Sequence, residues 1–181
     1  MAHDTATTVT GNGTPVPDLP VDLGDARVRA AIALIWHEAR LLDAKEYGAW
    51  DTLWAPGGTY VVPIDPDTTD FAATLNLVYD DDRLRRMRIE RLTGGFSLSA
   101  AAAARTVRTV SGFTVTARDE DTIELRSAMV LVGHKREETF VLAADVTHHL
   151  VFDQRENPRI QRKIIRLVNS QDAVTASGFL L

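Results

Sequence analysis

The sequence predicts an α+β domain in which N-terminal helices pack on one face of an antiparallel sheet. Two observations support this prediction. Up to about residue 92, apolar residues recur mainly at helical spacing, whereas after Gly94 and Gly95 they alternate at the two-residue period of β-strands. A strongly bent sheet in such an arrangement forms a cone, with the helices on its concave face and a pocket between the two layers.

Composition limits the kinds of function that this chain can have. Its 181 residues are 45% hydrophobic and 25% charged, which suits one soluble globular domain. The net charge of -5 gives no general attraction to nucleic acid or to an anionic membrane. With no cysteine, the chain cannot form a disulfide, a thiolate zinc site or a cysteine-ligated iron–sulfur cluster. The apolar runs are too short to span a bilayer and the N-terminus lacks a signal peptide, so we expect a cytoplasmic protein.

Residues 1–23 are rich in Thr, Gly and Pro and show no apolar period, which predicts a flexible N-terminal arm before a single domain at residues 24–181. A first helix is expected from Arg27 to Leu42, where apolar residues form one stripe. A second, shorter helix should follow, because Asp43 and Glu46 have the spacing of a capping box. This second helix should end at the Pro-Gly-Gly of residues 56–58, before a short strand at 59–63.

The stretch from Tyr79 to Leu92, YDDDRLRRMRIERL, places three carboxylates in front of five arginines. Asp80 is the expected helix N-cap, with Asp81 and Asp82 in the first turn, where the helix dipole favours negative charge. A metal site is the weaker interpretation, because adjacent helical residues diverge by about 100° and their oxygens do not converge on one cation.

Three arginines of this helix, Arg85, Arg88 and Arg91, fall within the arc of its apolar residues. Two interpretations remain open. Their aliphatic stems can lie along the core while the guanidinium groups reach water or a carboxylate. Alternatively, this face contacts another chain, since arginine at an apolar surface is common in protein interfaces. A nucleic-acid helix is the weakest interpretation, because the acidic chain offers no wider basic patch.

The second half of the chain predicts four or more strands. Segments 105–117, 123–131, 140–152 and 159–171 carry the two-residue apolar period, and Lys135 to Glu138 should form a charged turn between the second and third. A bulge is expected at Ser111 and Gly112, because the inward parity of the apolar residues changes there.

Two adjacent histidines, His148 and His149, must point to opposite faces of a strand and therefore cannot chelate one metal. Asp145 and His149 share a face, where they could act as an acid/base pair on a small ligand. A strand surface that faces solvent or another subunit accounts for them equally well. The chain has no nucleophile elbow, P-loop or dinucleotide-binding glycine motif, so the residues alone show no catalytic constellation.

Several segments together resemble one family, the small (beta) subunits of aromatic-ring-hydroxylating dioxygenases, over about residues 25–175. The resemblance implies a cone-shaped fold of the nuclear-transport-factor-2-like, or cystatin-like, type. It also implies a large (alpha) subunit as partner in an α3β3 hexamer, with the small subunits themselves associated as a trimer. In this family the large subunit carries the Rieske iron–sulfur cluster and the mononuclear iron, so we expect no cofactor and no metal in this chain. The segments that carry the resemblance are ARLLDAKEYGAWDTLWAPGGTYVVPID (39–65), YDDDRLRRMRIERLTGG (79–95), RTVRTVSGFTV (105–115), SAMVL (127–131) and RKIIRLVNSQDAV (162–174).

The function that this resemblance implies is a non-catalytic small subunit that braces the large-subunit trimer of an oxygenase acting on aromatic compounds. The expected subunit-contact residues are Arg85, Arg88 and Arg91. An alternative is a free-standing pocket enzyme of the same superfamily, such as a dehydratase, isomerase or polyketide cyclase, using Asp145, His149 or Tyr60. A third possibility is a homo-oligomeric binding module.

Overall fold

The computed structural model describes residues 19–94, 104–153, 157–170 and 179–181. Residues 1–18 of the expected arm and the loop at 95–103 lie outside the described residues. The helices and strands follow one another as β1 (Leu19–Pro20), α1 (Ala26–Asp43), α2 (Tyr47–Asp51), β2 (Trp54–Pro63), β3 (Asn76–Asp80), α3 (Asp82–Thr93), β4 (Arg105–Arg118), β5 (Thr122–Lys135), β6 (Glu138–Phe152) and β7 (Pro158–Leu167).

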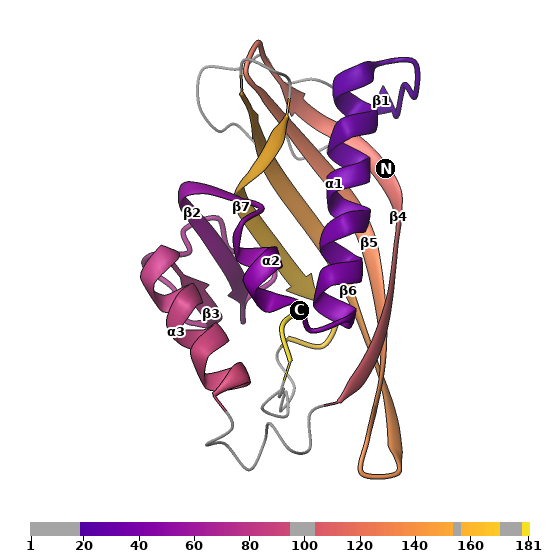
Figure 1. The fold of residues 1–181 in the computed structure, drawn as a ribbon. Helices are drawn as coiled ribbons and strands as arrows, with labels where there is room; N and C mark the ends of the chain where they lie inside the picture. Colours follow the sequence, from indigo (N-terminus) through magenta and orange to yellow (C-terminus); the bar gives the residue numbers. More distant parts are fainter. Residues whose placement is uncertain (1–18, 95–103, 154–156, 171–178) are drawn as a thin grey trace, which may run out of the picture.

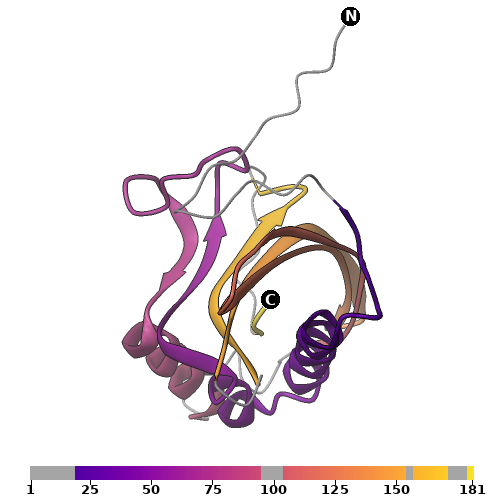
Figure 2. The same ribbon diagram turned by 90° about the horizontal axis from the view of Figure 1, so that it is seen from above.

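The described strands form one seven-stranded sheet in the order β1-β4-β5-β6-β7-β2-β3. Neighbouring strands are antiparallel except β2 and β7, which run parallel. The long helix α1 lies against β4, β5 and β7 (Figure 1). Figure 2 shows that the C-terminal residues lie on the same side of the sheet as α1. The predicted α+β class, with N-terminal helices against a mostly antiparallel sheet, is confirmed.

Helix α1 forms as the apolar spacing predicts. Asp25 caps its N-terminus, where the Asp25 carboxylate accepts hydrogen bonds from the backbone N–H groups of Arg27 and Val28. The apolar stripe lies against the sheet and is buried. One charged residue, Glu38, is buried within the same stripe; its buried members are Val28, Ala31, Ile32, Ile35, Glu38, Ala39 and Leu42.

The long hairpins also agree with the sequence. The tight turn between β5 and β6 uses Arg136 and Glu137, both at positive φ, within the predicted charged turn. In β4 the register shifts between Ser111 and Thr114, where Gly112 has φ +66°, a value that residues with a side chain rarely adopt. The predicted bulge is therefore confirmed.

Several local features differ from the prediction; the capping box at Asp43 and Glu46, for example, does not form, because Asp43 ends α1 and the N-cap of α2 is Glu46 without a side-chain hydrogen bond. The Pro-Gly-Gly stretch does not end a helix, because β2 already begins at Trp54 and accommodates Gly57, at φ +74°, in an irregular stretch of its pairing with β7. The N-cap of α3 is Asp81 rather than Asp80, since the Asp81 carboxylate accepts from Leu84 N. Asp80 instead ends β3, a short strand that the sequence did not indicate.

The ends of the sheet differ from the expectation as well. Within the range predicted as a flexible arm, Leu19 and Pro20 pair with Val115 and Thr114 of β4. Strand β7 ends at Leu167, four residues before the predicted end. In the part of the chain that the structure describes, no helix is long and apolar enough to cross a membrane.

Candidate functional site

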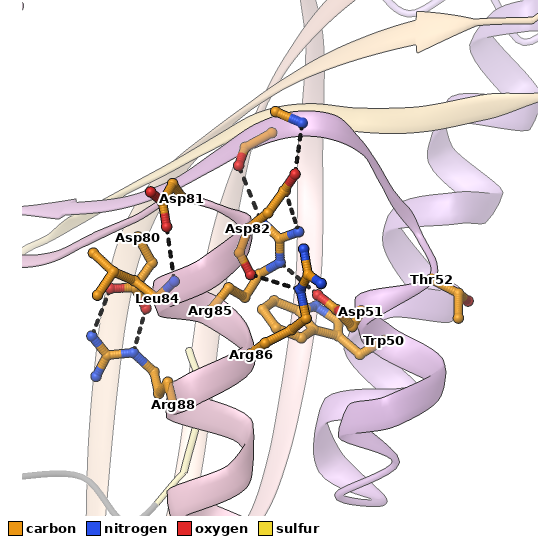
Figure 3. A network of polar contacts seen from close by, with 12 residues as sticks. Trp50, Asp51, Thr52, Asp80, Asp81, Asp82, Leu84, Arg85, Arg86 and Arg88 are labelled. Carbon is orange, nitrogen blue, oxygen red and sulfur yellow. Dashed lines mark hydrogen bonds and ion pairs between the residues drawn. The ribbon is translucent and has the colours of Figure 1, made fainter.

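Arg85 is the buried centre of the network around α3, although it was expected at a subunit contact (Figure 3). Its Nε donates to Asp51 at 2.7 Å, its Nη2 to Asp82 at 2.8 Å, and its Nη1 to the carbonyl oxygen of Gly58 at 3.0 Å. The guanidinium also lies 4.3 Å from the ring centroid of Trp54, a cation–π contact. With its side chain 3% exposed, Arg85 has almost no surface to offer a second chain.

Asp82 ties this network to β2. Its carboxylate accepts from the backbone N–H of Gly57 at 2.8 Å as well as from Arg85. These two hydrogen bonds, the one from Gly57 first, lower the pKa of Asp82. The Asp82 carboxylate, which remains charged at neutral pH, therefore links the first turn of α3 to the irregular part of β2 by a hydrogen bond.

Arg88 makes a bidentate pair with Asp80, through Nε at 2.5 Å and Nη2 at 2.9 Å (Figure 3). The Asp80 side chain is buried, whereas the Arg88 side chain is partly exposed. This is the arrangement in which an arginine stem follows the core and its head meets a carboxylate, one of the two interpretations that the sequence left open. Arg91, the third expected contact residue, is exposed near the C-terminal end of α3.

The residues of the alternative catalytic site do not come together. Asp145 and His149 are four residues apart on β6, which separates their Cα atoms by about 13 Å. The Asp145 carboxylate lies 3.6 Å from Arg126, and both side chains are exposed. His149 Nδ1 lies 2.9 Å from Glu124 on the neighbouring strand. Tyr60 is buried elsewhere, where its hydroxyl bonds the backbone of Leu181.

A buried charged cluster, which the sequence analysis did not identify, lies between α1 and the sheet. Glu38 of α1 is 2% exposed. One of its carboxylate oxygens accepts from Lys163 Nζ and from Trp50 Nε1, both at 2.9 Å. The other oxygen lies 2.9 Å from His148 Nε2, so the imidazole presents its Nε2–H to the carboxylate. Charge and hydrogen-bonding capacity of the buried carboxylate are therefore satisfied inside the chain.

The pKa values in this cluster follow from burial and pairing. Burial alone raises the pKa of Glu38, but the charge of Lys163 and the hydrogen bond from His148 outweigh it and hold this pKa far below its ordinary value. For His148, burial is the largest cause and lowers the pKa, although Glu38 acts in the opposite direction. Burial likewise lowers the pKa of Lys163 against the attraction of Glu38. The cluster is best described as a carboxylate–ammonium pair bonded to a neutral imidazole.

A small cavity of about 10 Å³ adjoins the cluster, which is room for about one water molecule. Of the polar atoms that line it in the described residues, two have no hydrogen-bond partner, Nδ1 of His148 and Nη1 of Arg108, whereas Arg108 Nε lies 3.5 Å from Asp43. Among the described residues, no group of three or more His, Cys, Asp or Glu side chains is placed to hold a metal ion. The space left beside the cluster is too small for an aromatic substrate.

The sequence did contain a signal for this cluster. His148 has the inward parity of Val146 and Leu150, and Glu38 falls in the apolar stripe of α1. An ionisable residue on a buried face requires a partner, and Lys163, within the apolar part of the last strand, is the residue that supplies it.

The order of the strands and the placement of the helices are those of an α+β protein with the nuclear-transport-factor-2-like fold. The family model described as "Ring hydroxylating beta subunit" matches residues 37–172. The chain belongs to the ring hydroxylating beta subunit family.

Solved structures with the same fold include relatives of this family. The beta subunit of benzoate 1,2-dioxygenase from Burkholderia mallei is 18% identical, with a TM-score of 0.68 over 90% of this chain and 99% of that chain. The beta subunit of a putative aromatic-ring-hydroxylating dioxygenase from Novosphingobium aromaticivorans is 13% identical, with a TM-score of 0.68 over 83% and 92%. A chain of naphthalene 1,2-dioxygenase with indole bound in the active site is 15% identical, with a TM-score of 0.68 over 84% and 82%. No curated protein sequence matches this chain.

Proposed function

We propose that this chain is the non-catalytic small (beta) subunit of a multicomponent ring-hydroxylating dioxygenase, and that it braces a trimer of large (alpha) subunits. The match of the beta-subunit family over residues 37–172 carries this proposal. The way in which the chain uses its buried charges agrees with a bracing role. Glu38 and Arg85 are bonded to other groups of the same chain, which stiffens the fold and leaves neither free to act on a substrate.

The oxygenase chemistry then belongs to the partner. A Rieske cluster needs two cysteines and two histidines, and these 181 residues contain no cysteine. The partner is a large subunit with a Rieske cluster and a mononuclear iron, supplied with electrons from NADH through separate proteins. The complex is an α3β3 hexamer in the cytoplasm that acts on an aromatic compound, and the small subunits associate as a trimer within it. The sheet of each small subunit is the strongly bent cone of this superfamily, with the helices on its concave face.

The contact with the large subunit includes the exposed side of α3. Arg91 is exposed there, and Arg88 is partly exposed although its head is held by Asp80. A guanidinium held by one buried carboxylate keeps a fixed direction and loses little conformational freedom when a second chain binds. Of the three arginines expected at a subunit contact, Arg88 and Arg91 are therefore the two that contact the large subunit.

Co-expression tests this proposal. The chain is produced together with the protein encoded by an adjacent reading frame that carries the Cys-x-His and Cys-x-x-His spacings of a Rieske protein. The two should co-purify as a particle with the mass of an α3β3 hexamer, and metal analysis after separation should find the iron with the large subunit. Arg91→Glu should weaken co-purification, whereas Arg159→Glu, at an exposed position of β7, serves as the matched control. A stable monomer with aromatic-ring turnover in the absence of any partner would contradict the proposal.

A further inference from the structure

Five exposed valines lie together on the face of the sheet that points away from α1. Their buried neighbours along the strands, such as Arg108 and Met129, point the other way and line the cavity beneath α1. Strand register sets the valines side by side in two adjacent rows, one across β4, β5 and β6 and one across β5, β6 and the end of β7. This valine patch, 43–81% exposed, consists of Val107, Val132 and Val141 in the first row, and of Val130 and Val168, on either side of Ala143, in the second.

A second exposed apolar surface lies at the other end of the sheet, on and just before β3 (Figure 2). Leu75, Leu77 and Tyr79 are 38–80% exposed and alternate with residues that are more buried. We call these three residues the β3 strip. The β3 strip and the valine patch account for eight of the eleven large apolar side chains that are exposed among the described residues. Single exposed apolar residues are normal, whereas contiguous ones mark surfaces that bind a partner.

The margin of the β3 strip is acidic. Asp65, Asp67 and Asp70 are exposed in segment 64–75, which joins β2 to the strip. One cation approaches this segment from the sheet, since Arg166 donates to the carbonyl oxygens at residues 66 and 68. Three carboxylates against one guanidinium leave this margin with a net negative charge.

The margin of the valine patch has the opposite sign. Arg105 is exposed on β4, two residues before Val107 and therefore on the same face of the sheet. The carboxylate of Asp145 lies on this face as well, but Arg126 balances it at 3.6 Å. The turn between β5 and β6 carries two basic and two acidic residues, so it adds no net charge. The two apolar surfaces are thus complementary in charge to each other, whereas neither is complementary to itself.

We propose that the valine patch of one copy of this chain packs on the β3 strip of the next, so that three copies close into a ring. The proposal rests on one part of the proposed function, the trimer of small subunits, and assigns its contact surfaces. A contact of one surface with itself closes at two copies, whereas a contact between two different surfaces can close at three. The valines and the β3 strip form the apolar core of each contact, and Arg105 and the aspartates form its polar rim.

Single substitutions test each surface in the purified full chain. Analytical ultracentrifugation should find the parent chain as a trimer. Val141→Asp and Leu75→Asp should each be monomeric, because every contact in the ring uses both surfaces and each variant carries a charge in one of them. Both positions are exposed in the single chain, so the far-ultraviolet circular dichroism spectrum should stay unchanged. If Val141→Asp loses that spectrum, Val168→Asp tests the same surface.

The matched control is Leu23→Asp. Leu23 is 62% exposed, as Val141 is 61% exposed, but it lies outside both surfaces. This variant introduces the same charge and should remain a trimer.

Mixing the two monomeric variants tests the pairing of the surfaces. The intact β3 strip of Val141→Asp can bind the intact valine patch of Leu75→Asp, and the surfaces left at the two ends both carry the substitution. The mixture should therefore form a one-to-one dimer and no trimer. A valine patch that bound another valine patch would leave the Val141→Asp chains monomeric in the mixture.

The proposal is overturned if the parent chain is a monomer, if Val141→Asp or Leu75→Asp remains a trimer, or if their mixture stays monomeric. Co-expression with the large subunit separates this result from the proposed partnership. A trimer that behaves as expected but co-purifies with no large subunit refutes the partnership and leaves the ring contact standing. An α3β3 particle that assembles normally with both variants keeps the partnership and overturns the ring contact, because the large subunits then hold the small subunits in place.

Discussion

Replacing Lys163 by Met should destabilise the chain strongly, because it leaves the buried carboxylate of Glu38 without the ammonium that bonds it. Glu38 is 2% exposed and Lys163 is 3% exposed, so water cannot take the place of the lost partner. Removing one member of a buried ion pair costs roughly 3–5 kcal/mol. For a chain of this length, each kcal/mol shifts the melting temperature by roughly 2–4 °C, so the expected fall is roughly 6–20 °C.

A double-mutant cycle separates this pairing from general damage to the core. Glu38→Gln alone removes the carboxylate, and Lys163 then loses its proton readily because burial already lowers its pKa. In Glu38→Gln with Lys163→Met, the amide oxygen still accepts from Trp50 and no charge remains stranded. The double variant should therefore lose at least about 2 kcal/mol less than the sum of the two single variants.

Urea denaturation at neutral pH, followed by far-ultraviolet circular dichroism, measures all of these free energies of unfolding. Arg159→Met, at an exposed position of the same strand as Lys163, is the control and should stay within about 0.5 kcal/mol of the parent. A loss of less than about 1 kcal/mol for Lys163→Met, or simple additivity in the double variant, would refute the account of this cluster.

Three further predictions concern α3, the buried imidazole and the exposed face of β6. Arg88→Ala strands a buried carboxylate and should cost roughly 3–5 kcal/mol, whereas Arg86→Ala, at an exposed position of the same helix, should cost about 0–1; equal losses in urea would contradict this. Because burial lowers the pKa of His148 below its ordinary 6.5, the unfolded chain binds the proton more tightly there, and stability should fall as the pH drops below 6.5. His148→Asn should flatten this dependence in unfolding measured across pH, and an unchanged slope would count against it. Replacing both Asp145 and His149 by Ala should leave turnover by the reconstituted oxygenase nearly unchanged; a loss of several orders of magnitude in kcat with assembly intact would place catalysis in this chain.

Features that depend on neighbours in the sequence were predicted well. The stripe of α1, the turn at Arg136 and Glu137, and the bulge at Gly112 each have a local signature of periodicity or backbone conformation. Strand β3 has no such signature, because its five residues run almost directly into α3 and, among the described strands, it pairs with β2 alone. The N-cap of α3 was predicted at Asp80 instead of Asp81 for the same reason, since Asp80 is the last residue of β3.

The buried cluster could not be predicted from local pattern, because Glu38 and Lys163 are 125 residues apart. The parity of His148 and the position of Glu38 indicated that each was buried, but neither indicated the partner. His149, the half-buried residue next in sequence, lies on the opposite face of β6 and bonds Glu124 instead. A partner across the core becomes visible only when the strand order places β7 beside β6 and under α1.

The parallel pairing of β2 with β7 has a consequence for the order in which the molecule folds. Tyr60 lies opposite Lys163, so this contact closes a loop of about a hundred residues, whereas β4, β5 and β6 join through short connections. During synthesis the aromatic residues of α2 and β2 leave the ribosome long before the strand that completes their sheet. We expect β4, β5 and β6 to form first, and the side of the molecule with β2, β3 and α3 to assemble last, once β7 is available.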